Sequence, residues 1–442
     1  MYNQQVLYQA RYRHAQHYLN QLGLASKLYS RGGNDVNHAV QKFEHDWSQI
    51  QQGQSWTRDK LDDETVANLC LLYPEHGNEL LSLRQTMSER IDWLENALKA
   101  ARFLSDESSE GKQLLALAQV YLQFGELELG VDYGKQVRSL AQRITDVGLE
   151  FMAVNAMAIG YHHLGDVHMA LTHFEDSVRV AREIGHEVGI MRSLGNLGVA
   201  YASLGKYRQA IDIYEQSLTL SRKSESLSDQ AADLCNLAVA YYDLDEFERA
   251  IVLLLEALDY ADQMKNEKSR RLYLFNLGIN YLKLEQYDDA IKVLDEALIL
   301  ARKYQNGYSE AYCMSALAEI YGNLGKVDLA LDYASKSRAF RRDAGDKRGD
   351  GIGAVTFGEI YYANGQLEKA LGYFEESLSI YREVEWQVGE GRTLESMAKV
   401  YHDLGKLDQA KAHYQLALKL VNAMGNNQAE HRIAEQLKLL NT

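Results

Sequence analysis

Leu194-Gly-Asn-Leu-Gly-Val-Ala-Tyr-Ala-Ser-Leu-Gly-Lys-Tyr-Arg-Gln-Ala-Ile-Asp-Ile-Tyr214 is the stretch that decides the fold, because its pattern recurs along most of the chain. Its tyrosine at position 201 has a counterpart at a constant spacing in both directions, at Tyr121, Tyr161, Tyr241, Tyr281, Tyr321, Tyr361 and Tyr401. The eight copies follow one another without insertion. A fixed period of this size is typical of a solenoid, in which each repeat packs mainly on its neighbours.

The spacing inside one copy predicts a pair of helices. Leu194, Leu197, Gly198 and Tyr201 fall at i, i+3, i+4 and i+7, which is one stripe of an α-helix. Gly205 is expected to end that helix, since glycine readily adopts the left-handed conformation. A second helix follows, with an inner stripe at Ala210, Ile211, Tyr214, Ser217 and Leu218. The recurring tyrosine is expected to fill the core, so Tyr241→Ala should open a cavity that costs about 3–5 kcal/mol.

The pattern Leu194-x2-Leu197-Gly198-x2-Tyr201, followed by Ala210-x3-Tyr214, resembles the signature of the tetratricopeptide repeat (TPR). The forty-residue unit is longer than the usual repeat of about 34 residues, and the proline that usually closes the second helix is absent. Longer helices would absorb both departures. The resemblance implies an all-α fold, a TPR α-solenoid in which helix-turn-helix repeats form a right-handed superhelix.

The predicted organisation has three parts. Residues 1–104 form irregular TPR-like helical pairs, residues 105–424 form eight regular repeats, and residues 425–442 hold a capping helix over positions 429–440. Near the start, Asn34 and Asp35 are candidates to cap a helix. A helix over residues 61–73 is expected to stop at Pro74, which lacks the backbone donor that helix continuation needs.

Forty-residue repeats of this kind are similar to those of Pins-type spindle-orientation adaptors, kinesin light chains and the sensor arrays of bacterial STAND signalling ATPases. Three N-terminal segments resemble the part of the chain that opens the STAND sensor, namely Tyr29-Ser-Arg-Gly-Gly33, Phe43-x3-Trp47 and Glu89-Arg-Ile-Asp-Trp-Leu-Glu95. In that family a nucleotide-binding domain precedes this segment, and here Met1 stands where that domain would have ended. The resemblance therefore implies a sensing role without an ATPase.

Composition narrows the class of protein. Hydrophobic residues make up 46% of the 442 residues, which is ample for a continuous core, and Pro74 is the single proline. The formal net charge of −15 argues against nucleic acid or an anionic membrane as the main partner. Three cysteines without Cys-x-x-Cys spacing favour a reducing, cytoplasmic location. The sequence shows neither a secretory signal nor a long continuous apolar run, so no membrane span is expected.

One face of each first helix is a candidate for binding a partner. In TPR proteins the face beside the core stripe lines the concave groove, and its candidates here are Arg192, Asn196, Val199, Asn236, Val239, Asn276, Ile279 and Lys283. Amide side chains donate and accept hydrogen bonds at once, so Asn196, Asn236 and Asn276 could hold an extended peptide backbone. The alternative is that the three asparagines brace adjacent helices.

A basic cluster is the second candidate surface. Arg338, Arg341 and Arg342 stand close together in an acidic chain, with Lys347 and Arg348 following. An acidic or phosphorylated partner could dock on these arginines. The alternative is a solvated helix end, where cations are favoured.

Signals for enzymatic chemistry are thin. The run Gly349-Asp-Gly-Ile-Gly353 has the glycines of a phosphate loop but no strand before it, and no Gly-x4-Gly-Lys-[Ser/Thr] occurs. His162, His163, His168 and His173 lack the spacing of a metal site. No catalytic residue, cofactor or metal is therefore predicted.

The preferred hypothesis is a non-catalytic scaffold, an adaptor or sensor, that binds a protein or peptide in its concave groove. A first alternative is a detached sensor of a STAND-type ATPase. A second alternative is a peptide-regulated phosphatase of the Rap type, whose N-terminal bundle acts on a response regulator. Ile91, Leu94 and Ala97 keep the TPR phase, which argues for a solenoid rather than a bundle there. The sequence predicts neither the partner nor the oligomeric state.

Overall fold

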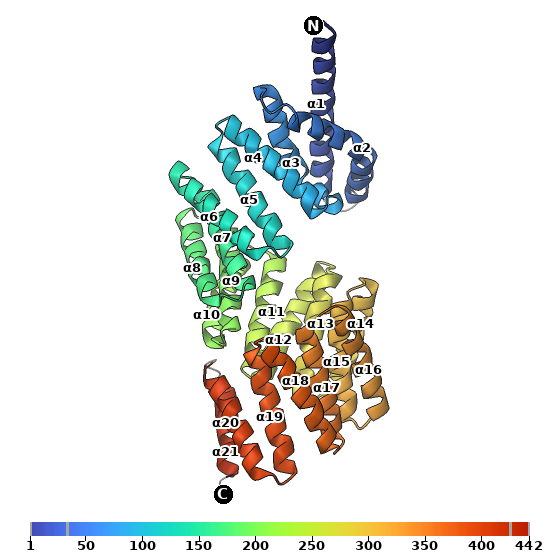
Figure 1. The fold of residues 1–442 in the computed structure, drawn as a ribbon. Coiled ribbons are helices and arrows are strands. Elements are labelled where there is room, and N and C mark those ends of the chain that lie inside the picture. Colours follow the sequence, from blue (N-terminus) through green and yellow to red (C-terminus); the bar gives the residue numbers. More distant parts are fainter. Residues whose placement is uncertain (1, 32–34, 424–426, 441–442) are drawn as a thin grey trace. The chain divides into compact units, whose positions relative to one another are not determined.

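The computed structural model describes residues 2–31, 35–423 and 427–440, and these ranges consist of helices joined by short turns (Figure 1). The described residues form 21 helices and no strand, which confirms the all-α solenoid. The first four are α1 (Tyr2–Arg31), α2 (Asp35–Arg58), α3 (Glu64–Arg84) and α4 (Met87–Phe103). Asn34, a predicted helix cap, lies outside the described residues.

The remaining helices form the regular array. They are α5 (Glu107–Gln123), α6 (Leu127–Ile144), α7 (Val147–His163), α8 (Val167–Glu183), α9 (Glu187–Ser203), α10 (Tyr207–Lys223), α11 (Leu227–Asp243), α12 (Phe247–Gln263) and α13 (Glu267–Lys283). They continue with α14 (Tyr287–Lys303), α15 (Gly307–Asn323), α16 (Val327–Asp343), α17 (Lys347–Ala363), α18 (Leu367–Glu383), α19 (Gln387–Asp403), α20 (Leu407–Ala423) and α21 (Asn427–Leu439). None of the helices in the described ranges is long and apolar enough to span a membrane.

The length of the repeat comes from the length of its helices. From α4 to α20 the helices begin at a constant interval along the chain, at Met87, Glu107, Leu127 and so on, so two helices make one repeat. Nearly all of these helices have 17 residues. The roughly six residues beyond a repeat of about 34 therefore lengthen each helix by almost one turn. Longer helices account for the unusual period, as the sequence predicted.

Within the regular array, from position 105 to position 405, each turn ends a helix by the same backbone arrangement. The N–H of Lys206 donates to the carbonyl of Tyr201 at 3.0 Å, and the N–H of Gly205 donates to that of Ala202 at 2.9 Å. This is the Schellman arrangement, which requires a left-handed residue at position 205. A left-handed residue occupies the corresponding position of every turn from Ser105 to Gly405, and half of these residues are glycine.

The non-glycine residues in these turns predict a stabilising substitution. Glu285 has φ 58°, a conformation that costs an L-residue about 1 kcal/mol, so Glu285→Gly should raise the free energy of unfolding by about 0.5–1 kcal/mol. The matched control is Gly325→Ala at φ 72°, which should lower it. Urea denaturation of both variants tests the sign, and a destabilised Glu285→Gly would contradict the turn geometry.

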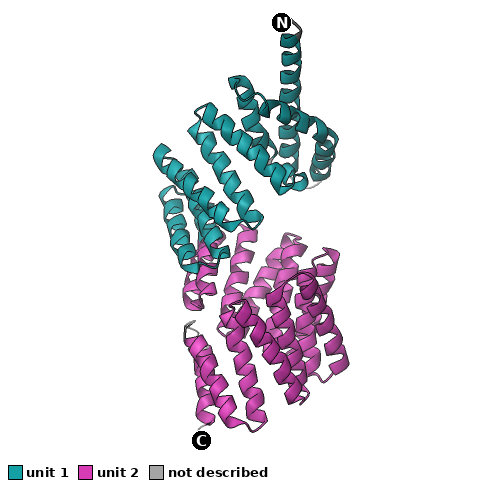
Figure 2. Cartoon of the chain, viewed as in Figure 1, with its two compact units in different colours: residues 1–193 teal, residues 194–442 magenta. Residues whose placement is uncertain are grey.

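The described chain divides into two compact units, residues 1–193 and 194–442 (Figure 2). In unit 1 the helix α1 packs against both α2 and α3, and these three helices are longer than those of the array. Their shared core is aromatic, with Phe43, Trp47, Tyr73 and Trp93 among its buried side chains. Helices α1, α2 and α3 thus pack on one another, and the regular helix spacing begins at α4.

The prediction that a helix stops at Pro74 is wrong. Helix α3 continues through Pro74 to Arg84. Proline removes one backbone hydrogen bond, but the helix buries Tyr73 before it and Leu80 and Leu81 after it in the same core. Burial on both sides of the proline offsets the lost hydrogen bond, which the local sequence does not reveal.

The hydrophobic core of unit 2 is continuous from α10 to α15, and α21 packs against α20 at the other end of the unit. Ala429 and Ile433 of α21 are buried against α20, as expected for a terminal helix. Residues far apart in sequence also meet within this unit. Arg392 donates to Asp243 at 3.1 Å, and Arg432 pairs with Asp245, so α19 and α21 lie beside the end of α11.

Seven of the eight recurring tyrosines are half-buried and lie at the edge of the core, and Tyr401 is buried. Tyr241 is half-buried and packs against the central cluster, and Arg249 lies over its ring at 5.6 Å. On α10, by contrast, Tyr214 is only 3% exposed. The expected cost of Tyr241→Ala is therefore too large, because much of the ring already contacts solvent.

Candidate functional site

Unit 2 contains two adjoining cavities of about 380 and 470 Å³. They are lined mainly by the first helix of each repeat. Both cavities are lined by Tyr242, Glu319, Ile352, Val355, Glu359 and Arg392, so we treat them as one unit 2 groove. The lining comes mainly from α11, α13, α15, α17 and α19.

The structure brings some of the predicted groove residues together. Val239, Asn276, Ile279 and Lys283 line the unit 2 groove. Asn196 and Asn236 are half-buried and Val199 is exposed, and all three lie outside the lining of these cavities. Arg192 falls in unit 1, where it lines a different cavity.

Asn276 links two helices and also lines a cavity. Its Nδ2 donates to Cys235 Sγ at 3.3 Å, which links α13 to α11. It also lines the unit 2 groove. The contact with sulfur is a weak hydrogen bond, so the amide braces the helices while remaining at the cavity wall.

Most charges in the unit 2 groove are paired within the protein. Lys283 donates to Glu319 at 3.0 Å, and the Glu319 charge raises the pKa of Lys283. Lys399 lies 3.3 Å from Glu395, and Arg392 pairs with Asp243. Burial raises the pKa of Asp243, although Arg392 opposes this shift.

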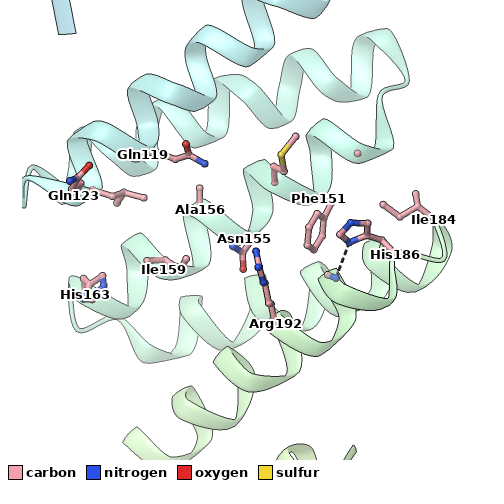
Figure 3. A pocket seen from close by; sticks show the side chains of 14 residues that line it. Gln119, Gln123, Phe151, Asn155, Ala156, Ile159, His163, Ile184, His186 and Arg192 are labelled. Atoms are coloured by element: carbon pink, nitrogen blue, oxygen red, sulfur yellow. Dashed lines mark hydrogen bonds between the residues drawn. The ribbon is translucent and has the colours of Figure 1, made fainter. Parts of the chain in front are cut away.

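Unit 1 contains a groove of different chemistry (Figure 3). One cavity of about 650 Å³ and another of about 430 Å³ share Gln119 and Met152, and we call the pair the unit 1 groove. Its walls come mainly from α3, α4, α5 and α7, with Gly189 and Arg192 from α9. Apolar side chains form much of the lining, among them Leu81, Trp93, Leu94, Leu115, Leu122, Phe151, Met152, Ile159 and Ile184.

Two amide side chains in the unit 1 groove have unpaired hydrogen-bonding atoms. Gln85 is only 8% exposed, and neither its Nε2 nor its Oε1 has a partner. Asn155 has a buried Oδ1 without a partner, and it lies with Arg192 in the same cavity (Figure 3). An unpaired buried polar atom costs about 1–3 kcal/mol, so these groups favour a ligand that completes their hydrogen bonds.

The charges of the unit 1 groove differ from those of the whole chain. Arg90, Lys112 and Arg192 line it, against the single carboxylate of Glu75. Glu75 already accepts from Gln113 Nε2 at 3.2 Å. The lining is therefore cationic in a chain of net charge −15, which favours neutral or acidic ligand groups.

Sequence reasoning missed Gln85 and Asn155. Gln85 follows α3 as its C-cap residue, outside the repeat pattern. Asn155 occupies the position before that of Asn196 in its repeat, and other copies hold different residues there. The signal that could have found Asn155 is the repeat phase, which places position 155 beside the groove positions 156 and 159.

Two of the three arginines in the predicted basic cluster are buried. Arg338 and Arg341 are 7% and 1% exposed, so a partner would not reach their guanidinium groups. Arg338 pairs with Asp350 and Glu376, each at 2.5 Å, and Arg341 lies over the Tyr312 ring at 4.3 Å. Arg342 is exposed but also pairs with Asp350, at 2.9 Å. The arrangement gives the arginines a structural role within unit 2.

The glycine-rich run lies in a helix rather than in a phosphate loop. Gly349, Gly351 and Gly353 all belong to α17. A side chain at Gly351 would collide with the Tyr381 ring, and one at Gly353 would lie 2.8 Å from Arg338 Cγ. The glycines thus make room for large neighbours. In the described part of the chain, no three His, Cys, Asp or Glu side chains are placed to hold a metal ion.

The geometry described above is that of a helical-repeat scaffold with grooves along its first helices, and the comparisons with known proteins agree. Tetratricopeptide repeat profiles match residues 150–223, 234–261, 269–343 and 352–423, more than half of the chain. The chain belongs to the tetratricopeptide repeat family. No curated protein is matched by sequence.

Three solved structures of Rap proteins share the fold. A Rap protein complexed with competence and sporulation factor has a TM-score of 0.58 and 14% identity, covering 85% of this chain and 97% of its own. The Rap conjugation gene regulator of plasmid pLS20, in complex with the Phr* peptide, has 0.55 and 12%, covering 71% and 96%. The apo form of RapI has 0.54 and 16%, covering 62% and 99%. At these identities the likeness concerns the fold alone.

Proposed function

We propose that the chain is a non-catalytic scaffold that binds an extended protein or peptide segment in the unit 1 groove. The observation that carries this proposal is the buried Gln85 amide, whose donor and acceptor both lack a partner at the wall of an apolar cavity. A peptide bond offers one acceptor and one donor, which is the complement of a side-chain amide. Asn155 offers a further unpaired acceptor in the adjoining cavity.

The rest of the groove fits the side chains of such a segment. Phe151, Ile159 and Trp93 provide apolar walls for alternate side chains of an extended ligand. Arg192, which lies beside Asn155 (Figure 3), suits an acidic side chain or a terminal carboxylate. The Rap complex with the Phr* peptide supports the proposal by fold likeness, because that solenoid holds a peptide.

The proposal includes an adaptor or sensor role for the chain. A scaffold of this kind acts as an adaptor or as a sensor, including a detached sensor of a STAND-type ATPase, according to the protein that presents the segment. A cytoplasmic location suits its three cysteines, which are unpaired and buried. Nucleic acid and membrane surfaces are not the proposed partners, since the chain is strongly acidic.

A cation placed at the shared wall of the unit 1 groove should block it. Met152 is 42% exposed and lines both cavities, so Met152→Arg should reduce binding by at least about tenfold while leaving the core filled. The assay is selection of peptides from a phage-displayed random library on the purified full chain, followed by affinity measurement of synthetic copies. Met169→Arg is the matched control, because Met169 on α8 is 37% exposed and lies outside the groove lining.

Three binding results are possible, and each supports or contradicts the proposal. Peptides that bind wild type and Met169→Arg but not Met152→Arg support the proposal. Equal binding to all three proteins would place the ligand elsewhere. Failure to select any peptide would count against peptide binding as the function.

A second candidate function is a peptide-regulated phosphatase of the Rap type. The favouring observation is that α1, α2 and α3 pack as three long helices, whereas Ile91, Leu94 and Ala97 lie in α4, where the regular spacing begins. The TPR phase of these residues therefore no longer argues against an N-terminal bundle. Dephosphorylation of a response regulator encoded beside the gene would support this candidate, and no effect on its phosphate would count against it.

A further inference from the structure

The unit 2 groove contains one carboxylate that its neighbours leave without a cation. Glu359 lies on α17, half-buried, and lines both cavities of the groove. It accepts a hydrogen bond from Ser396 Oγ at 2.7 Å, and no Lys or Arg of the described residues lies within ion-pairing distance. Lys283 and Lys399 are near enough to act on its charge, but each pairs with another carboxylate.

The surroundings of Glu359 make its negative charge unfavourable in the free protein. Burial and the neighbouring Glu319 raise the pKa of Glu359, while Ser396, Lys399 and Lys283 oppose the shift. The like charge at Glu319 comes from α15, on the adjacent first helix. A positive group supplied from outside would relieve both the burial of Glu359 and its repulsion from Glu319.

An acceptor without a hydrogen-bond partner lines the same groove. Asn280 is 2% exposed, and its Nδ2 donates to the carbonyl of Asn276 at 2.8 Å. Its Oδ1 has no partner. The unit 2 groove therefore presents an amide acceptor without a donor beside a carboxylate without a cation, whereas in unit 1 both the Nε2 and the Oε1 of Gln85 lack a partner.

Aromatic rings also line the unit 2 groove. Phe275 and Tyr312 line the groove with their ring centroids 5.8 Å apart, and Tyr242 lines it as well. The faces of such rings attract the guanidinium of arginine and the ammonium of lysine. Carboxylate, amide acceptor and aromatic wall together match a long basic side chain.

We propose that the unit 2 groove is a second binding site, which takes an arginine or lysine side chain of a protein or peptide segment between Glu359, Glu319 and the aromatic wall. The ligand chemistry is opposite to that of the unit 1 groove, where three cationic residues face one carboxylate. The two sites lie in separate compact units, so the proposal does not depend on peptide binding in unit 1.

The test uses the purified full chain and a phage-displayed random peptide library, with Glu359→Gln as the variant. Glutamine keeps the shape and removes the charge, so the fold is expected to persist, and a melting temperature checks it. Glu368→Gln is the matched control, because it removes the same charge from an exposed position on α18 outside the groove lining. Wild type and Glu368→Gln should select a class of peptides rich in arginine or lysine, and Glu359→Gln should not.

A measurement on the peptide itself does not depend on folding of the variant. Replacing the basic residue of a selected peptide by norleucine should weaken its binding to wild type about tenfold or more, and should change its binding to Glu359→Gln little. The proposal is overturned if no basic class is selected, or if Glu359→Gln binds that class as well as wild type does. If peptides sensitive to Met152→Arg are still found in that case, the unit 1 function stands and only the second site fails.

Discussion

Replacing Tyr214 by alanine is expected to lower the free energy of unfolding by about 3–5 kcal/mol, the range for a fully buried large aromatic side chain. Tyr214 is 3% exposed on α10, and its ring fills the space that the missing side chain of Gly198 leaves on α9. Alanine would leave a cavity between the paired helices, which these rigid helices could close only in part.

Tyr241→Ala is the informative comparison. Tyr241 belongs to the series that defines the repeat, but its ring is half-buried, so its loss should be clearly smaller than that of Tyr214. Urea denaturation followed by circular dichroism measures both. Equal losses, or a larger loss at Tyr241, would contradict the burial seen in the structure.

The second large effect concerns the three asparagines of the repeat. If Asn196, Asn236 and Asn276 hold a ligand backbone, their joint replacement by alanine should weaken binding by about 2–4 kcal/mol, roughly 30-fold to 1000-fold, if the effects add. Folding should suffer less, because all three side chains are only half-buried and truncation leaves little that is buried and unpaired. The two measurements are the melting temperature and the affinity for a peptide that binds the unit 2 groove, since none of the three asparagines lines the unit 1 groove.

The structure sharpens this test at one residue. Asn276 donates to Cys235 and lines the unit 2 groove, so Asn276→Ala alone should lower both affinity and melting temperature slightly. Asn196 and Asn236 lie outside the cavity lining, so Asn196→Ala and Asn236→Ala should lower affinity only if the ligand extends beyond the two cavities. A large fall in melting temperature with unchanged affinity in the triple variant would mean that the asparagines brace the helices.

The sequence by itself determined the repeating architecture. The evenly spaced tyrosines and the i, i+3, i+4, i+7 stripe specify helix pairs whose partners are close in sequence, so local periodicity is enough to predict them. The capping role of α21 and the length of the helices follow from the same pattern. The repeat phase identified only some of the positions in the cavity lining, since Ile279 and Lys283 line the unit 2 groove but Asn196 and Asn236 do not.

Only the tertiary structure decided which of those positions carry unmet hydrogen bonds and charges. The continuation of α3 through Pro74, the burial of Arg341 and the three-helix packing of residues 1–84 depend on contacts that no local pattern encodes. The unpaired atoms of Gln85 and Asn280 and the uncompensated carboxylate of Glu359 depend on which neighbours fail to reach them. Periodicity gives the direction in which a side chain points, but the distance to its neighbours on other helices decides whether it is satisfied or ready to bind.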